Sequence, residues 1–352
     1  MKVHSRIIPA LALLVALSLS CLKGGAGEKD GADTASGRVK ILCTTFPMFQ
    51  ITRNVVGDAE GVSVEILLPA DAGCPHDYAL TPLDLAKLAE ADLLVANGLG
   101  MESFLGAPLD RANPDIVVID SAEGMDDLLG YESVGDPVMV YVDDHGHVHD
   151  ENCDHGHETK PEDNPSAEKQ AKEPEHGHGD AINPHLFVSP ALNADLAENI
   201  ARQLGEADED RAELYRRNAA AYGASMRGLA DDMKKAVAGF ANNRIVEPHG
   251  AFDYLARDIG LEIVAMMQPH GQELSASQML ELIEDIREND AGAIVTEPQY
   301  PARTGEMLSR ETGIPAVMLD PGASGPDNAP LNHVETLMRR NIEALRETLG
   351  RK

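Results

Sequence analysis

The chain has 352 residues, which is long enough for two domains that each bury a hydrophobic core. Its formal net charge at pH 7 is −30, so nucleic acids and acidic membrane surfaces are excluded as favoured partners, whereas cations are attracted. Trp is absent and aromatic residues make up only 4% of the chain, which argues against a sugar or nucleobase site built on ring stacking.

The N-terminal residues have the pattern of a secretory signal. Lys2 and Arg6 precede an apolar run over residues 7–19, which is too short to cross a bilayer comfortably. We expect residues 1–20 to be a signal peptide and residues 21–37 to be a flexible, Gly-rich tether. Cys21 stands where a lipoprotein carries its acylated residue, although Ser18 replaces the expected Leu. We therefore predict export to the periplasm or cell surface with a lipid anchor at Cys21, and soluble export is the alternative.

Three further cysteines, Cys43, Cys74 and Cys153, remain after Cys21. Cys43 lies in a predicted strand and Cys74 beyond the next one, so a disulfide between them is compatible with an oxidising compartment. A role of Cys74 as a metal ligand is less favoured, because Pro75 directs its side chain away from that of His76.

Strand and helix patterns alternate from residue 38 onward, which predicts a parallel sheet covered by helices. The capping residues Thr81, Pro82 and Asp84 mark the start of one of these helices. The predicted strands cover residues 40–45, 63–68, 92–96 and 115–120, and the predicted helices cover residues 47–56, 82–90 and 101–111.

Residues 143–180 interrupt this series with seven His and twelve Asp or Glu. The segment has almost no apolar residues to bury, so we predict a disordered insert. The frequent His-x-His sequences favour weak metal binding. A merely solvated acidic loop would explain the acidic residues but not the histidines.

After the insert, a helix over residues 190–204 precedes a long helix over residues 206–237. The long helix carries an apolar stripe, and Gly223 and Gly228 are expected to bend or break it. A second series then follows, with strands over residues 244–246, 262–266, 293–296 and 316–319 and helices over residues 251–259, 276–287, 303–312 and 331–349. We thus predict an α/β fold with an N-terminal lobe (38–205), a connecting helix (206–237) and a C-terminal lobe (238–352).

Three Pro-His dipeptides share one local context, a loop that leads into a helix, and they contain His76, His185 and His249. Ligands of open α/β sheets bind beyond the carboxyl ends of the strands. Asp320 ends the last predicted strand, and three imidazoles plus one carboxylate complete a four-coordinate zinc site. A lone His of this kind would be interpreted as a hydrogen-bonded loop residue, but the shared context favours one metal site between the lobes.

Several motifs of the chain resemble those of the substrate-binding proteins of bacterial ABC importers for zinc and manganese, the cluster A-I family. The resemblance implies two α/β lobes joined by one long helix, with His76, His185, His249 and Asp320 binding metal in the cleft. It also implies an ABC permease and its ATPase as partners, and we expect a monomer. The resemblance covers nearly all of residues 38–349, and the matching segments are residues 43–47, 75–84, 91–102, 183–190, 248–256, 296–300 and 319–321.

His249 and the His-rich insert resemble the zinc branch of that family, because manganese-binding members tend to have a carboxylate at the third ligand position. Cys74 and Asn183 stand where the family usually has Asp, and both changes could alter how the ligands are oriented. Glu297 or water is the alternative fourth ligand. His270 matches no family ligand and is expected at the surface or the rim of the cleft.

We therefore predict a binding protein, and not an enzyme, that captures Zn²⁺ outside the cytoplasmic membrane for an ABC permease. The first alternative is a zinc hydrolase of the envelope. It is disfavoured because no His-Glu-x-x-His sequence is present and Asp320 would close the position that catalytic zinc keeps open. The second is an adhesin or zinc buffer on the same fold, which the sequence does not separate from an importer component.

Overall fold

The computed structural model describes residues 38–70, 75, 78–130, 139–142, 148–150, 182–267 and 274–350. Within this part of the chain, no helix is both long and apolar enough to cross a membrane. Several predictions fall outside the described residues, namely the signal peptide, the tether and the roles of Cys21, Cys74, His76, Cys153 and His270.

The first half of the chain forms a parallel sheet with the strand order β2-β1-β3-β4. Ile41 of β1 pairs with Val64 on one side and Leu93 on the other, so β1 lies inside the sheet. The strand order therefore reverses between β1 and β3. The elements are β1 (Val39–Cys43), α1 (Phe46–Val56), β2 (Val62–Ile66), α2 (Pro82–Glu90), β3 (Leu93–Ala96), α3 (Gly106–Ala112) and β4 (Val117–Asp120).

The second half repeats this topology, because its parallel sheet has the order β9-β8-β10-β11. Its strand order reverses between β8 and β10. Both series confirm the predicted alternation, with boundaries that differ by a few residues. The elements are β8 (Arg244–Glu247), α6 (Asp253–Ile259), β9 (Glu262–Met266), α7 (Ala276–Glu288), β10 (Ala293–Thr296), α8 (Arg303–Thr312), β11 (Ala316–Met318) and α9 (His333–Leu349).

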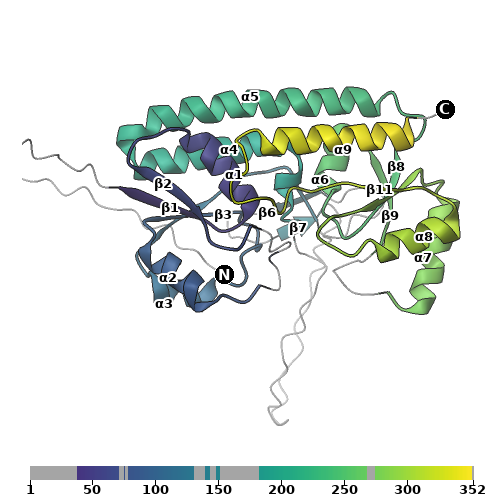
Figure 1. Ribbon diagram of the computed structural model, residues 1–352, viewed down its shortest axis with the longest axis horizontal. Coiled ribbons are helices and arrows are strands. Elements are labelled where there is room, and N and C mark those ends of the chain that lie inside the picture. Colours follow the sequence, from purple (N-terminus) through teal and green to yellow (C-terminus); the bar gives the residue numbers. More distant parts are fainter. Residues whose placement is uncertain are drawn as a thin grey trace, which may run out of the picture. The chain divides into compact units, whose positions relative to one another are not determined.

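Two helices connect the series, α4 (Pro190–Ala207) and α5 (Ala212–Val237). The long helix begins later than predicted, since residues 206 and 207 belong to α4 and Glu209–Arg211 form a 3₁₀ turn, η4. The predicted break is wrong, because α5 runs on through Gly223 and Gly228. A Cβ at Gly223 would lie 3.4 Å from the Cβ of Ala194, so this glycine allows close packing of α4 against α5. Figure 1 shows that α5 runs along α4. Helix α5 also packs on α1, α6 and α9.

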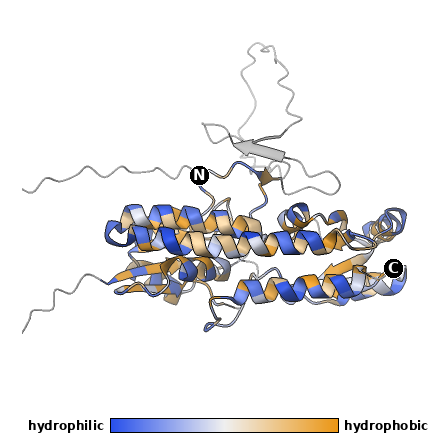
Figure 2. Ribbon diagram, turned by 90° about the horizontal axis from the view of Figure 1, so that it is seen from above, coloured by the Kyte–Doolittle hydropathy of each residue, from blue (hydrophilic) through white to orange (hydrophobic). Residues whose placement is uncertain are grey.

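The helices are amphipathic, as the alternating colours along them in Figure 2 show. Most of them contact strands of the two sheets, whereas α3 packs on α2 and α5 packs on other helices. In α9 the buried apolar residues recur at helical spacing: Val334, Leu337, Met338, Ile342, Leu345 and Leu349.

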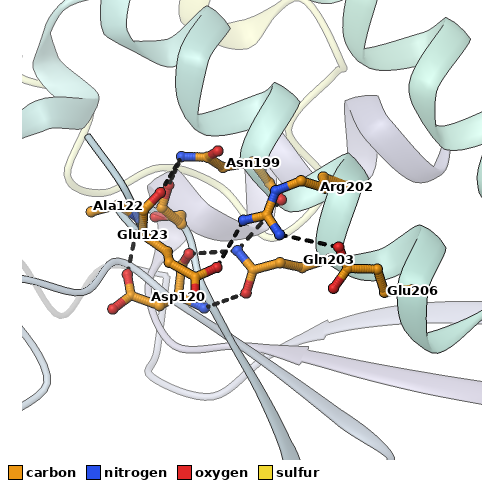
Figure 3. A network of polar contacts seen from close by, with 8 residues as sticks. Asp120, Ala122, Glu123, Asn199, Arg202, Gln203 and Glu206 are labelled. Carbon is orange, nitrogen blue, oxygen red and sulfur yellow. Dashed lines mark hydrogen bonds and ion pairs between the residues drawn. The ribbon is translucent and has the colours of Figure 1, made fainter. Parts of the chain in front are cut away.

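Figure 3 shows how α4 is fixed to the end of β4. The backbone N–H of Asp120 donates to Gln203 Oε1 (3.2 Å), and its carbonyl accepts from Gln203 Nε2 (2.7 Å). Arg202 forms an ion pair with Glu123 (2.7 Å), and Asn199 Nδ2 donates to the carbonyl of Glu123 (3.1 Å). These contacts hold the helix that follows the second Pro-His loop against the first sheet.

The helix predicted over residues 101–111 is shorter in the structure and spans Gly106–Ala112. The reason is that the preceding residues form turns around the carboxylate of Glu102. It accepts the N–H of Asn97 (2.7 Å), the N–H of Gly98 (3.1 Å) and the hydroxyl of Thr44 (2.8 Å). Burial raises the pKa of the Glu102 carboxyl to about 7.

A small antiparallel sheet was not predicted, and it consists of β5 (Leu128–Leu129), β6 (Met139–Val142) and β7 (Val148–Asp150). The prediction of disorder is therefore wrong for β7, which lies within the insert. Its partner strand β6 lies before the insert, so the insert's own composition could not reveal the pairing. The remainder of the insert, residues 143–147 and 151–180, lies outside the described residues.

After β11 the chain returns to α1 through residues 321–332, here called the return segment. The N–H of Gly325 donates to the carbonyl of Ala70 (2.9 Å), and Arg53 Nη1 donates to the carbonyl of Ala329 (2.6 Å). Gly325 also lies directly on the ring of Phe46, since a Cβ at this glycine would be 2.3 Å from Phe46 Cζ. The return segment therefore joins the end of the second sheet to the first half of the chain.

Cys43 at the end of β1 is a buried free thiol, so the disulfide considered for it is not formed. Burial raises the pKa of this thiol to about 12. Such a thiol is poorly reactive, because the nucleophile is the thiolate.

Candidate metal centre

Two functional side chains of the second sheet lie where its strand order reverses. His249 follows β8, and Glu297 follows β10 directly. Loops at such a reversal separate and leave a crevice in which α/β proteins bind ligands. His185 comes from the other half of the chain, just before the 3₁₀ helix η3 (Leu186–Val188) and α4, which Ser189 caps.

These loops enclose a small cavity of about 20 Å³. A cavity of this size holds roughly one water molecule or one ion. Its lining includes Pro75, His185, His249, Glu297, Gln299 and Tyr300.

The two histidines face one another across the cavity. Their ring centroids are 5.6 Å apart, and the ring planes are inclined by 84°. His185 is 3% exposed and His249 is 8% exposed, so both rings are withdrawn from solvent. Two imidazoles on one tetrahedral zinc, with Zn–N bonds of ~2.0–2.1 Å, would have centroids roughly 5 Å apart. The pair therefore has the spacing that a shared ion requires.

The carboxylate of Glu297 lies against the ring of His249. Its Oε1 lies 3.1 Å from His249 Nδ1, and Tyr300 packs against the same ring with a centroid distance of 5.2 Å. A carboxylate behind a histidine is a common partner of metal-binding imidazoles.

A buried acidic pair lies beneath the His249 loop. Glu247 is fully buried and Asp253 is 4% exposed. Burial, and then the neighbouring Asp253 carboxylate, raise the pKa of Glu247 well above its ordinary value. The N–H of Phe252 donates to Glu247 Oε2 (3.1 Å) and offsets part of this cost. A raised pKa means that Glu247 keeps its proton to a higher pH, so the pair carries less negative charge than two ordinary carboxylates.

The structure brings some of the predicted ligands together and leaves others apart. His185 and His249 share the cavity with Pro75, the residue that precedes His76, whereas His76 itself lies outside the described residues. Asp320 does not line the cavity, but its Oδ1 accepts from Gln299 Nε2 (3.2 Å) and from the N–H of Gly322 (2.9 Å). Among the described residues, no group of three or more His, Cys, Asp and Glu is arranged to hold a metal ion.

Sequence reasoning did not predict that Gln299 and Tyr300 line the cavity, or that Glu297 supports His249. The signal was present, because Glu297 and Pro298 end a predicted strand in the same way as the Pro-His loops do. The pairing itself joins residues 48 positions apart and depends on the order of the strands in the sheet.

The family model for the zinc-uptake complex component A, periplasmic (ZnuA), matches residues 41–348. The chain belongs to the ZnuA family. This finding confirms the resemblance that the motifs indicated. Members of this family are periplasmic components of zinc uptake and not enzymes. This agrees with the predicted export and does not support an envelope hydrolase.

Two relatives of the ZnuA family illustrate the similarity. The high-affinity zinc uptake system protein ZnuA of Bacillus subtilis is 28% identical over 350 residues, which cover 97% of this chain and 96% of the relative. The zinc-binding protein AdcA of Streptococcus pyogenes is 28% identical over 318 residues, which cover 89% of this chain. The match spans only 56% of the length of AdcA.

The fold of this ZnuA-family chain is similar to that of solved substrate-binding proteins. The structure of FpvC from Pseudomonas aeruginosa in complex with Mn²⁺ superposes with a TM-score of 0.68 at 27% identity, covering 89% of this chain and 98% of FpvC. This similarity and the two parallel sheets confirm the predicted α/β fold class.

Proposed function

We propose that the chain captures Zn²⁺ as cargo in the cavity between His185 and His249 and delivers it to an ABC permease with its ATPase. The observation that carries this proposal is the pair of buried histidines whose rings are 5.6 Å apart at a cavity of one-ion size. The family match and the names of the zinc-binding relatives support the same conclusion.

The ligand set that we propose is His76, His185, His249 and Asp320. His76 follows Pro75, which lines the cavity. The carboxylate of Asp320 accepts a hydrogen bond from Gln299, which also lines the cavity. Asp320 is the fourth ligand that the family resemblance implies, and Glu297, which lines the cavity, is the alternative.

The donor set favours zinc over manganese. Imidazole nitrogen suits Zn²⁺, whereas Mn²⁺ prefers oxygen donors and stands lowest in the affinity order of divalent ions. The net charge of −30 attracts cations to the protein, and both histidine rings are buried. Because the ligands must be deprotonated, uptake of the ion releases protons and weakens in acid.

Further parts of the proposal concern the whole protein. We infer an N-terminal lobe (38–205), a connecting helix (206–237) and a C-terminal lobe (238–352), with the ion bound between the lobes. The packing of α5 on α1 and α4 and also on α6 and α9 supports this division. We further infer export by the signal peptide, a lipid anchor at Cys21, a monomeric protein and weak zinc sites in residues 143–180.

The test is zinc binding by the metal-free full chain in competition with a tight chelator, which keeps zinc off the weaker sites. The wild type is expected to take one zinc per chain from the chelator, and His185→Ala and His249→Ala are expected to lose it. The control is His333→Gln, because His333 packs on Phe46 (centroid distance 5.5 Å) and does not line the cavity. Retention of the tight zinc by both alanine variants would refute the proposed site.

A further inference from the structure

We propose that Asn183 is a positioning residue that sets the tautomer of His185 and ties the His185 loop to the His249 loop. The inference rests on the proposed function only in assigning a metal to the site. The arrangement of hydrogen bonds around Asn183 carries the rest.

Backbone groups fix which way the Asn183 amide points. Oδ1 accepts the backbone N–H of His185 (2.9 Å), a group that can only donate. Nδ2 donates to the backbone carbonyl of Gly250 (2.7 Å), a group that can only accept. The oxygen and nitrogen of the amide therefore cannot be exchanged without breaking both contacts.

The amide in turn fixes the tautomer of His185. Oδ1 of Asn183 also lies 2.9 Å from His185 Nδ1. Because Oδ1 only accepts, Nδ1 must carry the hydrogen. The lone pair of the neutral ring is then on Nε2, and a histidine binds a metal through the nitrogen that carries the lone pair.

Asn183 also connects the two histidine loops mechanically. Its Nδ2 donates a second hydrogen bond to Asp253 Oδ2 (2.8 Å) at the start of α6, and Gly250 is the residue after His249. Its backbone N–H donates to the carbonyl of Leu129 (2.8 Å), and its carbonyl accepts the hydroxyl of Tyr254 (2.8 Å). The residue is fully buried and uses every polar group that it has.

Next to Asp253, this position favours an amide over the Asp that the family usually has. An aspartate at position 183 would still accept from His185, but it would lose both donated bonds and place a second carboxylate 2.8 Å from Asp253. Like charges at that distance are strongly unfavourable where water is excluded. Exchanging the two groups, in Asn183→Asp with Asp253→Asn, would restore one donor and one acceptor across the pair.

The experiment reads the ring directly in the metal-free full chain with ¹⁵N-labelled histidine, by two-bond ¹H–¹⁵N NMR at pH 8, where neutral rings are observed. The spectrum of His185→Gln assigns the signals of His185. The wild type is expected to show the Nδ1–H tautomer. Asn183→Leu is expected to show a tautomer mixture and to bind zinc about 10- to 100-fold more weakly, the usual loss when the partner of a ligand is removed.

Two further variants separate positioning from general stability. Tyr254→Phe removes a hydrogen bond to the Asn183 backbone but leaves the amide in place, so it should lower the melting temperature and leave the tautomer unchanged. Asn183→Asp should weaken zinc binding, and adding Asp253→Asn should restore much of it, which keeps the test decisive if Asn183→Leu fails to fold.

The outcomes for this inference and for the proposed function are distinct. A wild type that takes no tight zinc, with a tautomer that still depends on Asn183, would refute the function and leave the positioning role intact. A wild type that binds zinc, with an unchanged tautomer in Asn183→Leu or no rescue in the exchanged pair, would overturn the positioning role alone.

Discussion

Replacing Gly325 by Ala should destabilise the protein through the contact between the return segment and α1. A Cβ at this position would lie 2.3 Å from Cζ and 2.6 Å from Cε1 of Phe46. Phe46 is 2% exposed and its ring packs edge-on against His333, so the ring has little space into which to move. Overpacking of this kind costs about 1–3 kcal/mol.

The expected loss should lower the melting temperature by on the order of 2–5 °C, measured by circular dichroism. Gly228→Ala is a matched control, because Gly228 lies inside α5 with no atom within 4 Å of the added methyl group. The same chemical change there should stabilise the protein by about 0.5–1 kcal/mol, since Ala favours the helix.

A double-mutant cycle with Phe46→Ala assigns the cause. Removing the ring costs about 3–5 kcal/mol in the wild type, but it should cost less in the Gly325→Ala background, where the added methyl group would otherwise clash with that ring. Additive effects of the two substitutions, or a Gly325→Ala variant as stable as the wild type, would refute the steric account of the return segment.

Three further predictions concern single side chains. Cys43 should react with a thiol reagent only on unfolding, since burial raises its pKa to about 12, and peptide mapping that finds it labelled in the native protein would contradict this. Burial raises the pKa of Glu102 from 4.5 to about 7, so its ionisation should lower the stability of the fold as the pH rises through that interval. The wild type should therefore gain stability relative to Glu102→Gln when the pH is lowered from 8 to 5. Stability profiles of the two proteins that run parallel over this pH range would contradict the prediction. His249→Glu should narrow the preference for Zn²⁺ over Mn²⁺ in competition binding, because it replaces a nitrogen donor by oxygen, and an unchanged ratio would exclude His249 as a ligand.

Local features of the fold could be predicted because nearby residues determine them. The helix start at Thr81 was predicted from its capping pattern, and Thr81 forms a complete capping box in the structure, as Ser275 does before α7. The positions of His185 and His249 followed from the Pro-His dipeptides, and the structure places both at one cavity. The strands of the two parallel sheets were also predicted, because each is a short apolar run that is followed by a turn.

Features that depend on distant partners could not be predicted. The amide of Asn183 contacts Asp253, 70 positions away, and nothing in the local sequence of either residue indicates the other. The return segment was not predicted for the same reason, since Arg53 and Ala329 are 276 positions apart. The continuity of α5 through Gly223 is another example, since α5 packs there on Ala194 of α4, and such packing can outweigh the low helix propensity of glycine.

The most direct test of the central claim is to locate zinc in crystals of the full chain grown with one equivalent of Zn²⁺, using anomalous diffraction at the zinc edge. The account predicts one strong peak per chain in the cavity, within ~2.0–2.1 Å of Nε2 of both His185 and His249. A peak bonded to Nδ1 of either ring, or zinc bound only elsewhere on the chain, would contradict it.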